Sequence, residues 1–384
     1  MQKVALILLG AGDSTRFKTK RIPKKQWLRV GEIPLWLKVA QEVSSFYPFS
    51  QCIITTDKNS VFYMQKYLDS LPFKVIIGGK TRQESLQNAL KEVKEDFVLV
   101  SDVARCNIPK EIFTAILEKI GDFDCVAPYL DVSDTIALDE ENLSYLKREK
   151  IKLIQTPQLS KTELLKKSLK LGEFTDESSA ICANGGKIGF IKGSQESKKI
   201  THISDLQSLN LPKTSKRAII GNGSDIHALS KGNGMILGGI KIPCEYSLIA
   251  HSDGDVCLHA LSDALLGAIG AGDIGEWFPD NDTAYKGADS SILLKKIVDF
   301  TYDVGYSIKQ ADITLFAQKP KLSPYKKEME KNIANILEIP NFCVNVKATT
   351  TEKLGFIGRE EGIFVQASVL LEYFDLQSLR KGEL

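Results

Sequence analysis

The first residues with the types and spacing for chemistry form a small-residue loop near the N-terminus. The run from Gly10 to Ser14 follows the apolar stretch Val4–Leu9, and Arg16 and Lys25 come next. Small residues after a strand let backbone N–H groups approach a phosphate chain, and the two cations could neutralise charge on a transferring phosphoryl group. The loop matches neither GxGxxG nor a Walker motif. An ordinary tight turn and a solvated basic loop remain alternative interpretations.

A candidate metal site lies in the second half of the chain. Asp225 and His227 are two residues apart, so on a strand both side chains project from the same face and could reach one metal ion. A third ligand is needed for such a site. Without one, the pair is better explained as an incidental Asp-x-His sequence.

The third ligand could come from a helix that starts near Asp253, which we expect to be its N-cap. Asp255, His259 and Asp263 would then share one face of this otherwise apolar helix, and such groups are costly to bury unless they are paired or ligated. One carboxylate and two imidazoles with an open fourth position form a zinc site of the Lewis-acid type. The alternative is a buried histidine paired with an aspartate for structural reasons.

A threonine-rich run near the C-terminus could bind phosphates. The consecutive residues Thr349, Thr350 and Thr351 follow a predicted strand and offer hydroxyl and backbone donors to phosphate oxygens. Glu352 could bind Mg²⁺ or Mn²⁺, and Arg359 could hold a phosphate with two hydrogen bonds. A threonine-rich strand end followed by a glycine turn is the plainer interpretation.

The elements that must position the first loop alternate between strand and helix patterns. This alternation predicts an α/β domain with a mostly parallel sheet, helices on both faces, and ligands at the carboxyl ends of the strands. We expect strands at Val4–Leu9, Cys52–Thr56, Lys74–Ile77, Phe97–Val100 and Cys125–Pro128, and helices at Leu35–Ser45, Gln83–Lys94 and Ile108–Ile120.

The second half has a different sequence pattern, with clustered glycines and two segments of strong helical periodicity. A polar, proline-containing stretch over residues 208–216 marks the seam, so we expect two unrelated domains, 1–211 and 212–384. Strands are expected at Arg217–Ile220, Met235–Leu237, Ile313–Ala317, Val344–Ala348 and Gly362–Leu371, and helices at Asp253–Ala268 and Ser290–Val304.

Composition excludes several classes of protein. The 384 residues are 43% hydrophobic and 26% charged, with a net charge of +2, so there is no bulk electrostatic case for nucleic-acid binding. The apolar runs are far shorter than the ~20 residues that cross a bilayer, and the first residues lack the pattern of a signal peptide. Seven cysteines without a CxxC pair argue against a disulfide framework. We therefore expect a soluble, cytoplasmic protein without membrane or nucleic-acid partners.

A series of motifs in the first half carries a resemblance to a known family. In chain order they are Gly10-Ala11-Gly12 with Arg16 and Lys25-Gln26, Gly78-Gly79 with Arg82 and Ser85, Ser101-Asp102-Val103-Ala104-Arg105, Asp134-Thr135, Thr156-Pro157-Gln158, Thr175-Asp176-Glu177 and Lys199-Ile200-Thr201. Over about residues 1–210 they resemble the cytidylyltransferases that act on 2-C-methyl-D-erythritol 4-phosphate. The resemblance implies a Rossmann-like nucleotidyltransferase domain.

By this resemblance, Arg16 and Lys25 would stabilise the pentacovalent phosphorus, and Asp102 would help to hold Mg²⁺ on the triphosphate. The incoming phosphate would be positioned by Lys199 and by an arm that a dimer partner could supply, with Thr135 and Arg148. The substrates would also contact Gly10, Ala11, Gly79, Ser85 and Arg105. Two departures from the family are a serine at position 14, where glycine is usual, and a longer spacer before the lysine pair, which makes Lys24 a rival to Lys25.

The second half carries a second series of motifs. They are Asp225-Ile226-His227, His251-Ser252-Asp253-Gly254-Asp255 with His259, Gly272-Asp273-Ile274-Gly275, Phe278-Pro279-Asp280 and the run Lys347–Gly358. Over about residues 217–374 they resemble 2-C-methyl-D-erythritol 2,4-cyclodiphosphate synthase, which implies an α+β domain. Such domains form trimers with sites between subunits, so the residues of one site need not belong to one chain.

This second resemblance implies zinc held by Asp225, His227 and His259, with the first two also bordering the substrate. His251 and Thr350 would stabilise the transition state, and Glu352 would hold a second cation, Mg²⁺ or Mn²⁺. The remaining substrate contacts would come from Asp273, Ala317, Lys321, Thr349, Thr351, Phe356 and Arg359.

Together the halves resemble the bifunctional enzymes of non-mevalonate isoprenoid precursor synthesis. The implied reactions are transfer of CMP from CTP to 2-C-methyl-D-erythritol 4-phosphate, and cyclisation of 4-diphosphocytidyl-2-C-methyl-D-erythritol 2-phosphate with release of CMP. A separate kinase must act between them, and dimeric first domains joined to trimeric second domains could assemble into a hexamer. The rival interpretations are a zinc hydrolase, which would release no cyclic product, and a non-catalytic nucleotide-binding module, which needs neither Arg16 and Lys25 nor a metal triad.

Overall fold

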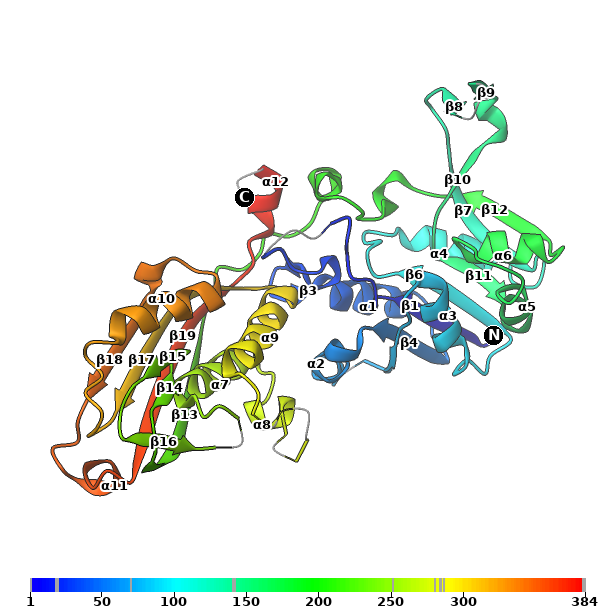
Figure 1. Cartoon of the computed structure of the whole chain (residues 1–384). Coiled ribbons are helices and arrows are strands. Elements are labelled where there is room, and N and C mark those ends of the chain that lie inside the picture. Colours follow the sequence, from blue (N-terminus) through cyan, green and yellow to red (C-terminus); the bar gives the residue numbers. More distant parts are fainter. Residues whose placement is uncertain are drawn as a thin grey trace. The chain divides into compact units, whose positions relative to one another are not determined.

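The computed structural model describes residues 2–17, 21–69, 71–139, 143–250, 252–279, 281–282, 285 and 287–381. The chain divides into two compact units (Figure 1). The first consists of Met1–Lys18, Lys24–Lys213 and Leu376–Leu384, and the second of Thr19–Pro23 and Thr214–Asp375. No helix within the described residues is long and apolar enough to cross a membrane.

The first unit is built on an eight-stranded sheet among the described residues, and the predicted mostly parallel α/β arrangement is confirmed. Strands β5, β4, β1 and β6 run parallel, β11 is inserted antiparallel between β6 and β7, and β10 and β12 both pair with β7. The strands are β1 (Val4–Leu9), β4 (Gln51–Thr56), β5 (Phe73–Ile77), β6 (Phe97–Asp102), β7 (Cys125–Asp131), β10 (Lys152–Ile154), β11 (Gln158–Lys161) and β12 (Ile188–Lys192).

Helices cover both faces of this sheet, as expected because every residue of β1 is buried. Apolar side chains of α3, α5 and α6 form a core with one face of β1 and β6. The helices of this unit are α1 (Leu35–Phe46), α2 (Val61–Gln65), α3 (Arg82–Leu90), α4 (Lys110–Leu117), α5 (Thr162–Ser168), α6 (Glu177–Ala183) and α12 (Leu376–Lys381). The sequence patterns indicate α1, α3 and α4 but not the shorter helices, whose apolar faces are too brief to show a period.

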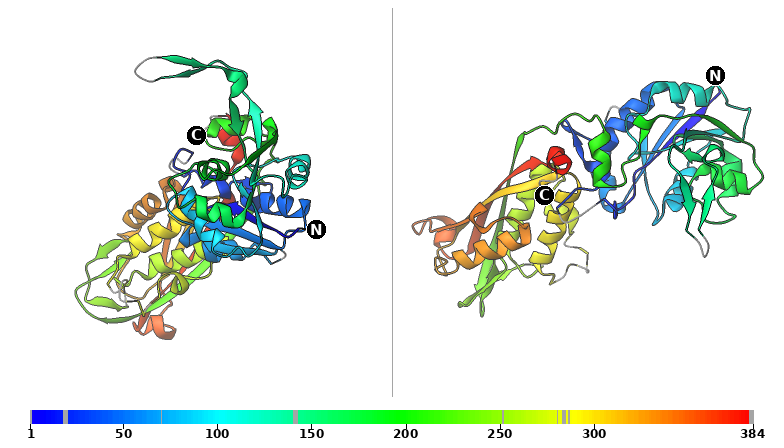
Figure 2. Two further views of the ribbon diagram at one scale, coloured as in Figure 1. Left: turned by 90° about the vertical axis from the view of Figure 1, so that its right-hand side faces the viewer. Right: turned by 90° about the horizontal axis from the view of Figure 1, so that it is seen from above.

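A hairpin of β8 (Ile136–Leu138) and β9 (Ser144–Leu146) projects from the first unit as an arm (Figures 1 and 2). Its apolar side chains are exposed, with Leu143 58% and Tyr145 67% accessible.

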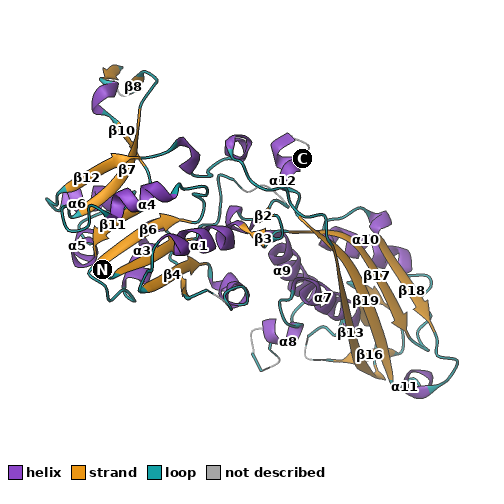
Figure 3. Ribbon diagram, turned by 180° about the vertical axis from the view of Figure 1, so that it is seen from behind, coloured by secondary structure: helices purple, strands orange, loops and turns teal. Residues whose placement is uncertain are grey.

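The second unit contains a five-stranded sheet in the order β16-β13-β19-β17-β18, with α7, α9 and α10 beside it (Figure 3). Its strands are β13 (Ala218–Lys231), β14 (Met235–Leu237), β15 (Ile240–Ile242), β16 (Tyr246–Ile249), β17 (Tyr306–Phe316), β18 (Val344–Thr349) and β19 (Gly362–Tyr373). Its helices are α7 (Val256–Ile269), α8 (Ile274–Trp277), α9 (Ser290–Asp303), α10 (Lys326–Leu337) and α11 (Gly355–Gly358).

Strand β13 extends well beyond the strand predicted at Arg217–Ile220. The rest of it was not predicted because glycines interrupt the β-rich sequence pattern. These glycines permit close packing. A Cβ at Gly221 would lie 2.0 Å from the carbonyl oxygen of Ala264 on α7, and one at Gly223 would lie 2.1 Å from that of Ala260. Helix α7 therefore rests directly on the backbone of the strand that carries Asp225 and His227.

Candidate functional sites

The carboxyl ends of the parallel strands in the first unit surround a pocket of about 370 Å³. The loop after β1, the start of α3 and the end of β6 meet there, and Gly78 lets two of these loops touch, since its Cβ would lie 2.2 Å from that of Ala11. The pocket brings together eight of the predicted site residues, which are Gly10, Ala11, Arg16, Lys25, Gly79, Ser85, Asp102 and Lys199.

The two candidate lysines have different surroundings. Lys25 lines the pocket, and its pKa is lowered by burial and by the nearby charges of Lys199 and Arg16, against the opposing effect of Asp102. The Nζ atom of Lys24 instead lies 3.1 Å from a carboxylate oxygen of Asp57. This geometry favours Lys25 as the residue that faces a ligand.

Ser14, where the first resemblance leads us to expect glycine, adopts the left-handed conformation with φ of 59°. Its hydroxyl accepts a hydrogen bond from the Lys25 backbone N–H at 3.1 Å and donates to Gln26 at 3.2 Å. A side-chain bridge thus ties the glycine-rich loop to the segment that carries Lys25.

Asp102 ends β6 at the floor of the pocket, and both of its carboxylate oxygens have cationic partners. Oδ1 lies 3.2 Å from Nε of Arg82, and Oδ2 lies 3.1 Å from Nζ of Lys199. Burial alone would raise the pKa of Asp102, but the charges of Arg82, Lys199 and Arg105 outweigh it and hold the pKa well below its ordinary value. The carboxyl group is therefore ionised at neutral pH.

Three predicted residues of the first unit do not line this pocket. Arg105 is buried beside it, where it donates to the Thr156 hydroxyl at 2.9 Å and to the Ser197 carbonyl at 2.6 Å. Thr135 and Arg148 flank the hairpin arm in the sequence, one before β8 and the other after β9, and Arg148 donates to the Ser133 carbonyl at 2.7 Å. Within one chain, the arm residues therefore do not share the pocket of Lys25.

In the second unit, three side chains converge on one point. Oδ2 of Asp225 lies 3.2 Å from Nδ1 of His259 and 3.6 Å from Nε2 of His227. One ligand atom from each residue lies within 4.8 Å of the others, beside a pocket of about 350 Å³. A carboxylate and two imidazoles around one position fit a divalent metal such as zinc.

The outer partners of His259 also fit a metal ligand. Its second ring nitrogen, Nε2, lies 2.9 Å from the Ser290 hydroxyl and 3.2 Å from the Ser252 hydroxyl. Ser290 is itself held by Asp253, which accepts from its hydroxyl at 2.5 Å and from its N–H at 3.1 Å. Metal-binding histidines are commonly oriented through their free nitrogen in this way.

The pKa values of the two histidines shift in opposite directions. Burial lowers the pKa of His227, although the charge of Asp225 opposes it. Burial also acts to lower the pKa of His259, but the hydrogen bond and charge of Asp225 outweigh it, so that pKa is raised.

The three side chains predicted to share one face of α7, those of Asp255, His259 and Asp263, have separate roles. Asp255, not Asp253, is the N-cap, so the predicted cap is wrong. The Asp255 carboxylate is fully buried and accepts from four backbone N–H groups, those of Gly238, Gly239, Cys257 and Leu258, which leaves it no part in the metal cluster. Asp263 lines the pocket and accepts from the Ile274 N–H at 2.8 Å. The carboxylate that His259 meets comes from β13, because α7 packs directly on that strand.

The remaining described residues predicted for the second site do not line the pocket beside the metal cluster, although Asp273 borders a neighbouring pocket that also includes Asp263. The threonine run and Glu352 follow β18, at the opposite edge of the sheet from β16, with β19 and β17 between β18 and β13. The Thr350 hydroxyl donates to Glu352 at 3.1 Å, and Arg359 pairs with Glu361 at 2.9 Å. None of the residues Asp273, Ala317, Lys321, Thr349, Thr350, Thr351, Glu352, Phe356 and Arg359 lines the described pocket beside the metal cluster, and His251 lies outside the described residues.

Three residues that contact predicted site residues were not themselves predicted from the sequence. Arg82 and Thr156 contact Asp102, and Ser290 contacts His259. Arg82 and Thr156 fall in motifs of the first resemblance, which is the signal that could have found them. Ser290 lies 31 residues from His259, and no spacing rule connects the two.

Comparisons with known proteins cover nearly the whole chain. Residues 4–211 match the family model described as 2-C-methyl-D-erythritol 4-phosphate cytidylyltransferase, and residues 218–372 match the YgbB family. The chain is 50% identical over 376 residues to a bifunctional enzyme IspD/IspF of Wolinella succinogenes, covering 98% of each chain. It is 50% identical over 380 residues to that of Campylobacter fetus, covering 99% of this chain and 100% of the relative.

A solved structure is also similar to this chain over nearly its whole length. The bifunctional IspDF from Campylobacter jejuni superposes with a TM-score of 0.86 at 48% sequence identity, covering 98% of this chain and 100% of that chain.

Proposed function

The chain belongs to the bifunctional IspD/IspF enzymes, and we propose how its residues carry out the two reactions. Residues 1–211 transfer CMP from CTP to 2-C-methyl-D-erythritol 4-phosphate and release pyrophosphate. Residues 212–384 cyclise 4-diphosphocytidyl-2-C-methyl-D-erythritol 2-phosphate to 2-C-methyl-D-erythritol 2,4-cyclodiphosphate and release CMP. One observation supports this division: each unit has its own polar pocket, one cationic and one with three metal-type ligands.

In the first reaction, the sugar phosphate attacks the α-phosphorus of CTP in line. Arg16 and Lys25 neutralise the charge that develops on phosphorus, and Lys199 positions the incoming phosphate. Asp102 has the right donor chemistry for Mg²⁺, which binds proteins through one or two carboxylates together with substrate phosphates. Bound at Asp102, Mg²⁺ (or Mn²⁺) would neutralise negative charge on the triphosphate. Cytosine and ribose lie against Gly10, Ala11, Gly79 and Ser85, and Arg105 supports the same region.

In the second reaction, the 2-phosphate attacks the β-phosphorus within one molecule, so the nucleophile is already tethered. Asp225, His227 and His259 hold Zn²⁺, which supplies Lewis-acid polarisation of the β-phosphate. His251 and Thr350 stabilise the transition state, and Glu352 holds a second divalent cation, Mg²⁺ or Mn²⁺. Ribose and cytosine are bound by Asp273, Ala317 and Lys321, and the phosphates by Thr349, Thr351, Phe356 and Arg359.

A second copy of the chain completes each site in this proposal. Strand β18 lies three steps across the sheet from β13, which at about 4.8 Å per step is roughly 14 Å. Because one chain does not bring Thr350 to its own metal cluster, a neighbouring second unit supplies it, as in a trimer. Likewise Thr135 and Arg148 reach the pocket of a dimer partner, and the two contacts together make a hexamer.

The intermediate between the two reactions carries one more phosphate than the first product. A separate kinase must therefore act between the two steps. All three substrates are small, charged molecules, and we place the enzyme in the cytoplasm.

The proposal is tested with the full chain and mass spectrometry of the products. CTP, the sugar phosphate and Mg²⁺ should yield pyrophosphate, and the phosphorylated intermediate should yield CMP and a cyclic diphosphate. Lys25→Ala should remove only the first activity and His259→Ala only the second, together with bound zinc. Release of inorganic phosphate without a cyclic product, or full zinc content in His259→Ala, would overturn it.

A further inference from the structure

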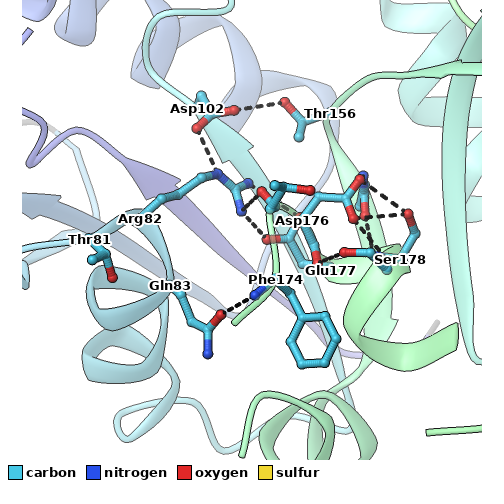
Figure 4. A network of polar contacts seen from close by, with 12 residues as sticks. Thr81, Arg82, Gln83, Asp102, Thr156, Phe174, Asp176, Glu177 and Ser178 are labelled. Carbon is cyan, nitrogen blue, oxygen red and sulfur yellow. Dashed lines mark hydrogen bonds and ion pairs between the residues drawn. The ribbon is translucent and has the colours of Figure 1, made fainter. Parts of the chain in front are cut away.

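A completely buried carboxylate in the first unit has no role in the reaction described above. Glu177 begins α6 and has no exposed surface. Both of its oxygens accept from one guanidinium, with Oε1 at 2.7 Å from Nη1 of Arg82 and Oε2 at 3.4 Å from Nη2 (Figure 4). Burial raises the pKa of Glu177, and the charge and hydrogen bonds of Arg82 oppose that effect. An isolated buried charge would be costly, so this paired arrangement requires Arg82.

The donors of Arg82 are almost all engaged by the protein. Nε donates to Oδ1 of Asp102 at 3.2 Å, and Nη2 donates to Oε2 of Glu177. Nη1 donates to Oε1 of Glu177 and also approaches the carbonyl of Thr175 at 3.5 Å. A guanidinium has five N–H groups, and these four contacts leave one. Although Arg82 borders the pocket, its geometry is that of a bridge between two carboxylates.

The bridge is anchored on both sides. Gln83, the next residue on α3, accepts from the Phe174 N–H at 2.7 Å (Figure 4). It also donates to the carbonyls of Gly172 and Leu169 at 2.9 and 3.0 Å. Asp176 caps α6 by accepting from the Ser179 N–H at 2.8 Å. The segment that carries Glu177 is therefore held to the start of α3 independently of the ion pair.

The two oxygens of Asp102 are consequently in different situations. Oδ1 is held by a guanidinium that is itself fixed by a buried partner. Oδ2 is held by Lys199, a pocket-lining residue whose side chain is 32% exposed, and by the Thr156 hydroxyl at 3.4 Å. A phosphate chain can attract the ammonium of Lys199 away from Oδ2. Arg82 cannot move in the same way, because the buried carboxylate of Glu177 would then have lost its ion-pair partner.

We propose that Arg82 and Glu177 are positioning residues that hold Asp102 by Oδ1 and thereby present Oδ2 to the divalent cation on CTP. This inference rests on the role proposed above for Asp102. It gives the Arg82 and Thr175-Asp176-Glu177 motifs a common purpose, since outer contacts of this kind orient carboxylate ligands and commonly change metal affinity about 10–100-fold when lost.

The test compares Glu177→Gln with a matched control. Asp124→Asn removes the carboxylate that pairs with Lys161 at 2.8 Å, at the opposite end of the strands from the pocket. Calorimetric titration with CTP, without sugar phosphate, is done in magnesium-free buffer and with saturating Mg²⁺. The measured quantity is the gain in CTP affinity on going from magnesium-free buffer to saturating Mg²⁺. We expect this gain to be about tenfold smaller in Glu177→Gln than in the wild type. The CTP affinity in magnesium-free buffer should change less than about threefold. Arg82→Lys lacks the planar fork of N–H groups that holds both oxygens of Glu177 while Nε reaches Asp102, so it should behave alike. Asp124→Asn should behave like the wild type.

Kinetics and stability separate positioning from a structural role. In Glu177→Gln the Mg²⁺ concentration for half-maximal pyrophosphate release should rise about tenfold, and excess Mg²⁺ should restore much of kcat. If Glu177→Gln and Arg82→Lys only lower the melting temperature, as Asp124→Asn does, and leave the Mg²⁺ dependence unchanged, the proposal is overturned. Asp102→Asn identifies the other failure, because an unchanged Mg²⁺ effect in that variant would refute the role of Asp102 itself.

Discussion

Replacing Gly223 by alanine should damage the metal site without touching a metal ligand. The new Cβ would lie 2.1 Å from the Ala260 carbonyl oxygen and 2.5 Å from the Ala264 N–H nitrogen, both backbone atoms of α7. Because neither can rotate away, the helix must move by about 1 Å to reach ordinary contact. His259 precedes Ala260, so its Nδ1 would move away from Asp225 Oδ2, from which it is now 3.2 Å.

The expected magnitude follows from packing and from ligand tolerance. Overpacking of this kind costs about 1–3 kcal/mol, which for a unit of this size lowers the melting temperature by roughly 2–12 °C. Metal sites tolerate ligand displacements of about 0.2 Å, so we expect zinc affinity and CMP release to fall about 10–100-fold. Pyrophosphate release by the first unit should remain unchanged, which makes the variant its own internal control.

Gly267→Ala is the matched control for this substitution. Gly267 lies within α7, and its Cβ would have only the Asn222 carbonyl oxygen nearby, at 3.7 Å. Alanine there should stabilise the helix by roughly 0.5–1 kcal/mol and keep zinc bound. Zinc content by mass spectrometry and CMP release by chromatography are measured for both variants. Full zinc content in Gly223→Ala, or equal loss in Gly267→Ala, would refute the reasoning that close packing of α7 sets the metal geometry.

Lys25→Ala should lower kcat of the first reaction about 10²–10³-fold, whereas Lys24→Ala should lower it less than about tenfold and cost up to about 1 kcal/mol of unfolding free energy; equal rate losses would contradict the assignment. Ser290→Ala should weaken zinc binding about 10–100-fold in competition with a chelator, while Ser291→Ala, next to it on α9, should leave the affinity unchanged, and the reverse order would exclude the hydroxyl as an orienting group. Burial alone would raise the pKa of Asp205, but Lys198 and the backbone N–H groups of His202 and Thr201 lower it to about 2. The pKa of Asp205 in the folded protein therefore lies below its ordinary value of 3.8. The stabilisation of the folded state by this ionised carboxylate is complete above about pH 4 and is lost as the pH falls toward 2. Asp205→Asn should therefore be less stable than the wild type by about 1–2 kcal/mol at neutral pH and by almost nothing near pH 2, as measured by urea unfolding; a difference independent of pH would count against it.

Local patterns predicted much of the fold. The continuous apolar run of β1 and the helical spacing of apolar residues in α9 are visible directly in the sequence. Strands β10, β11 and β12 were missed because their runs are short and their pairing with β7 is made at long range. The same reason hid α6, whose importance lies in the single contact between Glu177 and Arg82.

The sequence by itself determined which chemistry the chain can perform. The spacing of Asp225 and His227 places both on one face of β13, and the loop before Arg16 lies at a strand end, because both depend only on neighbouring residues. Which partners these groups meet depends on packing across the chain. The approach of α7 to β13 decided that His259 meets Asp225 while Asp255 became a cap. Contacts over 95 residues decided that Arg82 joins Glu177 to Asp102. Such pairings follow from how whole elements pack, which no local spacing encodes.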